Sequence, residues 1–320
     1  MAFHLIELDI VRTSPPTIEV YKSKPYSSCR IEGGRRLRGS LNLASKSGIP
    51  LVSIITVVYN GERYLEKTIQ SAINQTYGNI EYIIIDAGST DNTLNIIRKY
   101  EDSIDYWLSE PDEGISDAFN KGIALSSGDI IGIINADDWY ELDTVRQVVE
   151  HIAKSGADIV HGMLQYWNDQ HKAELFEAKD SLLNKDMTVN HTTVFVSRMC
   201  YQRYGLFRKD FRYAMDYEWL LRAKVNGAIF SYIERCLANM RLGGLSDSRW
   251  QSALYEVAKA KSINLHGIIN CYFYFVYQII KGGIRRLLEW AGLNLIARLY
   301  HSRFSLVKKI HETESKNKID

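Results

Sequence analysis

The sequence predicts an α/β protein whose sheet is mostly parallel and carries helices on both faces. Short continuous apolar runs recur from residue 51 onward, as expected for strands that are covered on both sides. A segment with apolar residues at helical spacing follows each of the first three runs, and the connections are short. This alternation of strand and helix is typical of a doubly wound parallel sheet.

The elements follow one another regularly up to residue 135 and more loosely after it. Strands are expected at 51–58, 80–87, 104–110 and 130–135, and helices at 62–75, 91–100 and 115–127. Further strands, expected as antiparallel additions, fall at 158–163 and 192–197, and a further helix at 216–226.

The net charge, the spacing of the cysteines and the N-terminal stretch each argue against certain classes of protein. The chain of 320 residues has a net charge of +1, so no global attraction to nucleic acid is expected. Its four cysteines are scattered without a C-x-x-C spacing, which favours reduced thiols over a disulfide framework or a zinc site. Glu7 and Asp9 interrupt the apolar N-terminal stretch, so no secretory signal is visible and a cytoplasmic location is expected.

Three regions differ in composition. Residues 1–48 form an irregular N-terminal extension, residues 49–246 the α/β domain, and residues 247–320 a helical C-terminal region. The arginines of the extension, Arg35, Arg36 and Arg38, could meet a phosphate, but a solvated basic loop is the preferred interpretation.

Polar side chains follow three of the predicted strands. They are Tyr59 and Asn60, then Asp86, then the cluster of Asn135, Asp137 and Asp138. Because ligands bind at the carboxyl ends of parallel strands, we expect these side chains to share one rim. Neighbouring carboxylates repel one another unless a cation lies beside them, and Mg²⁺ or Mn²⁺ bound together with substrate phosphates fits best. A turn or helix cap is the alternative for the Asp–Asp pair alone.

Two other places attract attention. Gly88 follows Asp86 closely and would let a ligand approach, so the Asp86 carboxylate could accept the imide N–H of uracil. Asn120 and Gly122 lie inside the helix at 115–127, where neither residue is favoured. Either a nearby ligand or a close contact between helix and sheet would explain them.

Four sequence blocks have a recognisable order and spacing. They are "VSIITVVYNGERYLEKTIQSAINQTY", "IEYIIIDAGSTDNT", "SEPDEGISDAFNKGI" and "INADD". These blocks resemble the inverting nucleotide-sugar glycosyltransferases of the GT-A fold, of the family 2 type, and especially the bacterial members that build cell-surface polysaccharides. The similarity extends over about residues 50–246.

The resemblance implies a substrate class and a cofactor. The donor would be a nucleoside-diphosphate sugar, for which we expect UDP, and a divalent cation, Mg²⁺ or Mn²⁺, would bind with it. The acceptor would be a hydroxyl of a growing glycan or of a polyprenyl-linked oligosaccharide. The reaction would be a single in-line displacement at the anomeric carbon.

The resemblance also implies roles for matching positions. Asp216, in "MDYEWLLR", would be the catalytic base, Asp137 would bind the metal, and Asp86 would contact the base of the nucleotide. Arg241 opens "RLGGLS", which looks like the segment that closes over the diphosphate. The full set expected to bind the nucleotide sugar is Tyr59, Asn60, Glu62, Asp86, Gly88, Ser89, Asn120, Asn135, Ala136, Asp137, His191 and Arg241.

Two positions depart from the family pattern, and two further residues each have two possible roles. Asn135 replaces the first aspartate of the Asp-x-Asp block, and Met215 replaces the glutamate before the base. His191 either touches the diphosphate or acceptor, or is a structural residue. Arg222 either assists the departing diphosphate or forms an ion pair with Asp216 or Glu218.

The C-terminal region predicts contact with a membrane surface. Residues 262–280 contain no charged side chain, and 19 residues is close to the ~20 that a membrane span needs. A polar stripe of His266, Asn270, Tyr274 and Gln278 favours an interfacial or packed helix instead. Basic residues follow among apolar ones, namely Lys281, Arg285, Arg286 and Arg298. We expect peripheral binding at the inner face of the plasma membrane; packing on the α/β domain is the alternative.

Two rival functions remain open from the sequence. A non-catalytic nucleotide-sugar-binding or scaffold protein at the membrane would explain Asn135 and Met215. A sugar nucleotidyltransferase would need a glycine-rich phosphate loop containing arginine after the first strand, where this chain has "YNGERYL".

Overall fold

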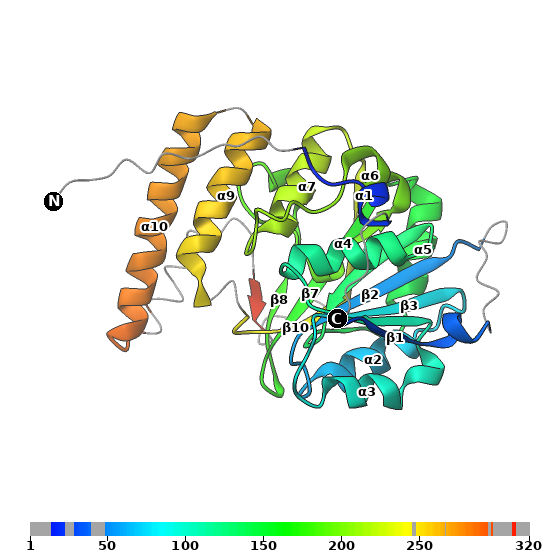
Figure 1. Ribbon diagram of the computed structural model, residues 1–320. Coiled ribbons are helices and arrows are strands. Elements are labelled where there is room, and N and C mark those ends of the chain that lie inside the picture. Colours follow the sequence, from blue (N-terminus) through cyan, green and yellow to red (C-terminus); the bar gives the residue numbers. More distant parts are fainter. Residues whose placement is uncertain are drawn as a thin grey trace, which may run out of the picture.

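A computed structural model describes residues 14–22, 29–39, 49–244, 248–265, 267–293, 296 and 309–311 (Figure 1). The described strands form one sheet in the order β1-β4-β3-β2-β5-β9-β7-β10-β6, with β8 beside β7 and β11 beside β8. The strands are β1 (Ile31–Gly33), β2 (Val52–Val58), β3 (Ile80–Asp86), β4 (Tyr106–Ser109), β5 (Ile130–Asn135), β6 (Trp139–Tyr140), β7 (Ile159–Asn168), β8 (His171–Phe176), β9 (Phe195–Ser197), β10 (Phe230–Arg241) and β11 (Lys309–His311).

The helices surround this sheet. The α-helices are α1 (Ile18–Lys22), α2 (Leu65–Ile73), α3 (Thr93–Lys99), α4 (Ile115–Leu125), α5 (Thr144–Ser155), α6 (Arg198–Tyr204), α7 (Met215–Val225), α9 (Trp250–Leu265) and α10 (Ile268–Trp290). Short 3-10 turns are η1 (Arg35–Arg38), η2 (Glu101–Ser103), η3 (Asp180–Leu182) and η4 (His191–Thr193).

The centre of the sheet is parallel. Strand β2 pairs in parallel with β3 and β5, and β3 pairs in parallel with β4. Every residue of β2 is buried, because α4 covers one face of the sheet and α2 and α3 cover the other (Figure 1). The predicted mostly parallel sheet with helices on both faces is confirmed.

Beyond β5 the next two strand pairs are antiparallel, and a parallel pair follows them. Strand β9 is antiparallel to both β5 and β7, as expected for an added strand. Strand β7 therefore runs in the direction of the central strands, and it pairs in parallel with β10. The antiparallel expectation is right for β9 and only partly right for β7.

Two arginines of the N-terminal extension form ion pairs with buried acids, so the interpretation as a solvated basic loop is wrong for them. Arg35 contacts Asp105 at 2.6 Å and Arg36 contacts Glu81 at 2.5 Å. Both acids are buried in the sheet region, where an unpaired carboxylate would be costly. The arginines lie beside them because β1, the strand at the edge of the sheet, pairs with β4.

The surroundings of Gly122 confirm that a close contact between helix and sheet explains this glycine. A Cβ atom on Gly122 would lie 2.4 Å from Cγ2 of Ile55 in β2, so the residue lets α4 approach the sheet closely. No ligand is needed to account for this glycine.

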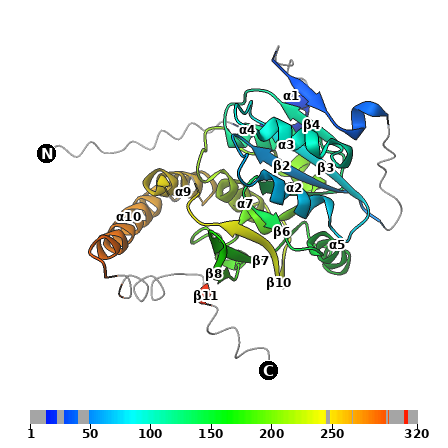
Figure 2. The same ribbon diagram turned by 90° about the horizontal axis from the view of Figure 1, so that it is seen from below.

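The C-terminal helices extend the molecule to one side. Helix α9 lies between α7 and α10, and α10 is outermost (Figure 2). Among the described helices, none is long and apolar enough to cross a bilayer. Of the residues singled out from the sequence, Glu7, Asp9, Ser246, His266 and Arg298 and the side chain of Asn270 lie outside the described part.

Candidate active site

The three predicted strand ends meet at one edge of the sheet. Val58 of β2 is paired with Asp86 of β3, and Val57 is paired with Asn135 of β5. The buried Thr68 hydroxyl in α2 lies 2.8 Å from the carbonyl oxygen of Ala136 and 2.6 Å from that of Asp138, and donates to both. These contacts therefore fasten the turn that carries the polar cluster to helix α2.

The loops after β2 and β3 are joined by hydrogen bonds. The Asn60 amide donates to the Ser89 hydroxyl at 2.7 Å, and the Asn92 amide donates to the Glu62 carboxylate at 3.0 Å. Asn60 itself has a positive φ of 50°. The Tyr59 side chain is 64% exposed at the same rim, so it is free to meet a ligand. The structure thus brings these predicted residues together.

Asp86 has a structural role in the turn that follows it. Its carboxylate is fully buried and accepts from the amides of Gly88 and Ser89, at 3.2 and 3.0 Å, and from the Ser109 hydroxyl at 2.6 Å. Gly88 adopts a φ of 80°, which this tight turn requires. Asp86 therefore shapes the loop at the rim, and its contact with the nucleotide base stays a prediction.

Asp137 and Arg241 share a cavity. The cavity has a volume of about 350 Å³, within the range of small-molecule sites. Its lining comprises Arg63, Tyr64, Asp137, Asp169, Arg241, Leu242, Gly243 and Gly244. It thus combines one carboxylate of the turn after β5 with cationic side chains from two other segments.

Aromatic rings hold two cations next to this cavity. The guanidinium carbon of Arg241 lies 4.0 Å from the Tyr64 ring centroid and 5.0 Å from that of Trp139. Nζ of Lys67 lies 3.1 Å from the Trp139 centroid. Burial, and then the charge of Arg241, lower the pKa of Lys67. Two cations so close together favour binding of an anion beside them.

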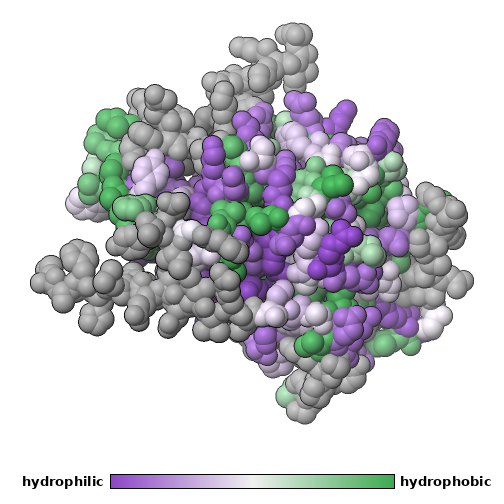
Figure 3. All heavy atoms as spheres, turned by 90° about the horizontal axis from the view of Figure 1, so that it is seen from above, coloured by the Kyte–Doolittle hydropathy of each residue, from purple (hydrophilic) through white to green (hydrophobic). Residues whose placement is uncertain are grey.

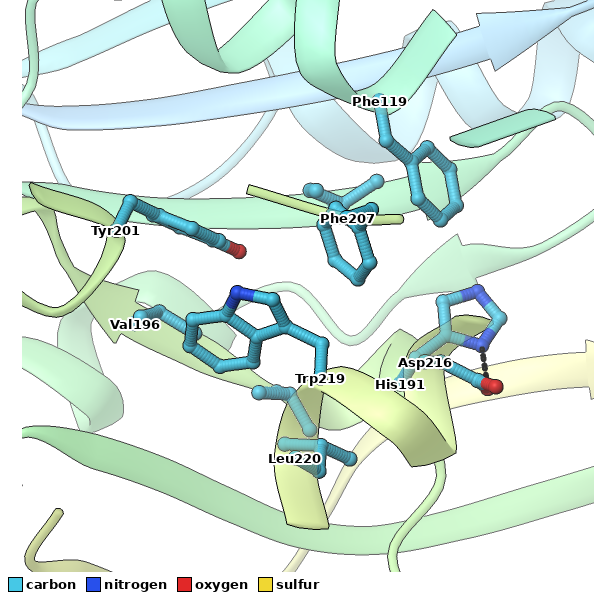
Figure 4. A pocket seen from close by; sticks show the side chains of 10 residues that line it. Phe119, His191, Val196, Tyr201, Phe207, Asp216, Trp219 and Leu220 are labelled. Carbon is cyan, nitrogen blue, oxygen red and sulfur yellow. Dashed lines mark ion pairs between the residues drawn. The ribbon is translucent and has the colours of Figure 1, made fainter. Parts of the chain in front are cut away.

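His191 and Asp216 form a pair beside the same turn (Figure 4). Nδ1 of His191 lies 3.4 Å from a carboxylate oxygen of Asp216, and Nε2 lies 3.2 Å from the Asn135 side-chain nitrogen. Asp216 stands in the first turn of α7, where the helix dipole favours a negative charge.

The charges around His191 set its protonation. Burial alone would lower its pKa, but the hydrogen bond and charge of Asp216, followed by the charges of Asp138 and Asp137, raise the pKa above the ordinary 6.5. The negative charges of these three carboxylates therefore all act on the same imidazole.

A small apolar cavity lies behind this pair. It measures about 20 Å³ and is lined largely by aromatic and aliphatic side chains, including Phe119, Phe207 and Trp219 (Figure 4). A space of this size holds about one water molecule, so in this structure it has no room for a sugar.

Asp138 is buried and braces the site. It accepts from the Thr192 hydroxyl at 3.1 Å and from the Arg241 amide at 3.3 Å. Burial, and then the neighbouring charge of Asp137, raise the pKa of Asp138 to about 8. The side chain therefore links η4 and the end of β10 to the turn after β5.

Asn120 and Arg222 are structural. The fully buried Asn120 amide donates to Phe207 O at 2.8 Å and to the Tyr21 hydroxyl at 3.1 Å, and its oxygen accepts from Phe207 N at 2.9 Å. The expected ligand contact of Asn120 is therefore wrong. Arg222 is buried in a two-point ion pair with Glu218, with both N–O distances 3.0 Å, which decides between its two alternatives.

Comparison with known proteins identifies the family. The model described as glycosyl transferase family 2 matches residues 53–211. An uncharacterised glycosyltransferase of Mycobacterium tuberculosis is 33% identical over 186 residues, which cover 54% of this chain and 69% of that relative. This chain belongs to glycosyl transferase family 2. It is therefore a glycosyltransferase.

Other relatives and solved structures of glycosyltransferases agree. A hyaluronan synthase of Pasteurella multocida is 27% identical over 242 residues, 69% of this chain and 24% of that enzyme. TarS 1–349 of S. aureus, in complex with UDP-GlcNAc, has a TM-score of 0.55 at 15% identity, over 80% of this chain and 73% of that one. The mannosyltransferase PcManGT of Pyrobaculum calidifontis, in complex with GDP-Man and Mn²⁺, has a TM-score of 0.56 at 16% identity, over 81% and 75%. The glycosyltransferase has the GT-A fold.

The residues of this glycosyltransferase fit a divalent cation that is shared with its donor. Asp137 is only partly buried and lines the cavity. Next to it, Oδ1 of Asn135 is buried with no hydrogen-bond partner among the described residues. Within that part of the chain, no group of three His, Cys, Asp or Glu side chains could hold a metal alone. One carboxylate completed by donor phosphates is an arrangement that Mg²⁺ accepts.

Several residues of the glycosyltransferase site escaped the sequence interpretation. Arg63, Tyr64 and Asp169 line the cavity, and Lys67 and Trp139 complete the cationic stack. Arg63 and Tyr64 could have been found, because they directly follow Glu62 in the first family block. Asp169 could not, since it stands in a hairpin between β7 and β8 with no motif around it.

The pairing of His191 with Asp216 predicts a measurable titration. In an NMR titration of the histidine resonances, His191 should titrate above 6.5, and Asp216→Asn should lower that pKa because it removes the nearest negative charge. The raised pKa means that this pair stabilises the fold fully below the unfolded pKa and loses that contribution as the pH rises through the folded pKa. An unchanged His191 titration in the variant would contradict the pairing.

Proposed function

We propose that this glycosyltransferase inverts the anomeric configuration as it moves a sugar from a nucleoside-diphosphate donor to an acceptor hydroxyl. The observation that carries the proposal is the separation of two kinds of group around one turn. Asp216 contacts His191, whose ring also reaches Asn135, whereas Asp137 and Arg241 line a cavity whose lining includes neither Asp216 nor His191. A base outside the cavity and a place for a diphosphate inside it suit a single in-line displacement.

Asp216 is the proposed catalytic base. As the acceptor oxygen bonds to the anomeric carbon, the hydroxyl proton passes to a carboxylate oxygen of Asp216, and the bond to the diphosphate breaks. The contact with Nδ1 of His191 at 3.4 Å orients the carboxylate, while the Tyr217 amide donates to its other oxygen at 2.8 Å. We assign His191 the role of a positioning residue.

The cavity receives the departing diphosphate. The Arg241 guanidinium, fixed between aromatic rings, offers positive charge where negative charge develops. Asp137 would hold Mg²⁺ or Mn²⁺ together with phosphate oxygens, and the bound cation would neutralise charge on the leaving group. Gly243 and Gly244 in the lining leave room for the phosphates to approach.

For the donor we propose a UDP-linked sugar. TarS, whose structure contains UDP-GlcNAc, shares the fold over most of this chain, which supports UDP. PcManGT, whose structure contains GDP-Man and Mn²⁺, makes a GDP-linked sugar the second candidate and supports the use of a divalent cation.

For the acceptor we propose a hydroxyl of a growing glycan or a polyprenyl-linked oligosaccharide. The similarity to hyaluronan synthase supports polysaccharide synthesis, since that relative is named for a polymer. We also propose a cytoplasmic location, at the inner face of the plasma membrane, where such acceptors and nucleotide sugars meet.

Substitution of the base tests the proposed mechanism. Asp216→Asn should reduce sugar transfer about 100-fold or more, because general base catalysis typically supplies that much, while donor affinity in calorimetry stays nearly unchanged. Asp102→Asn, at a carboxylate 88% exposed and paired with Arg38, is the matched control and should transfer normally. Full activity of Asp216→Asn would remove Asp216 from the role of base.

Removal of the cation tests the role of Asp137. EDTA should suppress turnover, and added Mn²⁺ or Mg²⁺ should restore it, because a single carboxylate and the donor phosphates hold the ion weakly. Asp137→Asn should need a higher cation concentration for half-maximal rate. Turnover that is indifferent to EDTA would contradict the metal proposal and leave Arg241 as the main counter-charge.

A further inference from the structure

Helix α10 turns its polar side toward the protein. The Tyr274 hydroxyl and the Gln278 amide each donate to one carboxylate oxygen of Asp186, both at 2.8 Å. Nζ of Lys261, in α9, lies 3.2 Å from the centroid of the Tyr274 ring. The polar stripe seen in the sequence therefore fixes the rotation of α10 about its axis, and its apolar side faces outward.

The outward side carries a regular apolar stripe. It consists of Phe273 (66% exposed), Tyr277 (53%), Ile280 (58%), Ile284 (41%) and Leu287 (63%), which we call the outer stripe. Their spacing of four and three residues places them on one face of a helix. Figure 3 shows hydrophobic residues gathered at the side of the molecule where α10 lies. So many large exposed apolar side chains in one row indicate an interaction surface.

We propose that the outer stripe binds the surface of an anionic lipid bilayer. Between Glu256 and Glu289 the chain has no acidic residue, whereas Lys281, Arg285 and Arg286 are basic. The C-terminal region from residue 251 has a net charge of +6, from 11 Lys and Arg against 5 Asp and Glu. Apolar insertion joined to attraction for anionic headgroups is the mode of a helix that lies in the membrane plane.

The aromatic residues agree with this placement. Phe273 and Tyr277 belong to the outer stripe, and Trp290 at the end of α10 is 85% exposed. Tyrosine and tryptophan are enriched at the level of lipid headgroups because their rings combine an apolar body with a polar group.

Charge argues against a second copy of the chain as the occupant. The 4-3 spacing of the outer stripe would also suit a coiled coil, whose flanking positions normally carry complementary charges. Here the flanking positions are Tyr274, Val276, Lys281, Gly283, Leu288 and Trp290. None of these is acidic, so an identical partner helix would offer no complementary charges at these positions.

Membrane binding deepens the proposed function, because it would bring the site close to a lipid-linked acceptor. It does not depend on the sugar chemistry, since α10 is anchored through Asp186 and not through Asp137 or Asp216. A vesicle assay without donor or acceptor therefore fails or succeeds independently of the transferase reaction.

The test is co-flotation of the full chain with vesicles of phosphatidylcholine, with and without phosphatidylglycerol. The unaltered protein should float with the anionic vesicles, and less so at high salt. The combined change Ile280→Ser, Ile284→Ser and Leu287→Ser should weaken binding at least about ten-fold, because it removes three apolar anchors.

A matched control separates this stripe from surface hydrophobicity in general. Leu142→Ser with Met199→Ser alters two side chains that are 61% and 63% exposed elsewhere, and it should leave flotation unchanged. Thermal unfolding and donor hydrolysis should be the same in all three proteins. Absence of flotation, equal flotation of the stripe variant, or a dimer in solution that the stripe variant abolishes would each overturn the proposal.

Discussion

The site depends on how one turn is held at the carboxyl edge of the sheet. The Thr68 hydroxyl fixes the carbonyls of Ala136 and Asp138 from below, and the buried Asp138 side chain accepts from Thr192 and from the Arg241 amide. The side chains of Asn135, Asp137 and Asp138 therefore point to different parts of the site. Asn135 meets His191, Asp137 lines the cavity, and Asp138 stays inside.

The carboxylates of the site therefore fall into two groups, those with a structural role and those that are proposed to react or bind a metal. Asp86 and Asp138 are fully or almost fully buried and accept hydrogen bonds from the protein, so they build loops. Asp137 and Asp216 keep part of their surface open, which a metal ligand or a base requires. Another buried carboxylate, Glu81 in β3, also has a structural partner, since Arg36 neutralises its charge.

The sequence predicted the sheet well because the apolar runs that form β2 to β5 have no other stable place in a globular protein. It also placed the ends of β2, β3 and β5 on one rim, since parallel strands end together, whereas Asp216 and His191 were found only through the family resemblance. It did not foresee that Asp86 accepts hydrogen bonds from its own turn, because the amino-acid sequence does not tell in which direction a carboxylate at a strand end points. It missed the ion pairs of Arg35 and Arg36, which depend on the pairing of β1 with a strand more than 70 positions away.

The central claim is a single displacement with the base and the diphosphate on opposite sides of the anomeric carbon. The most direct measurement is NMR of the new glycosidic bond, made from a donor whose sugar is α-linked to the diphosphate. The account predicts a β-linked product, since one in-line attack inverts the configuration. A product that retains the α configuration would contradict it.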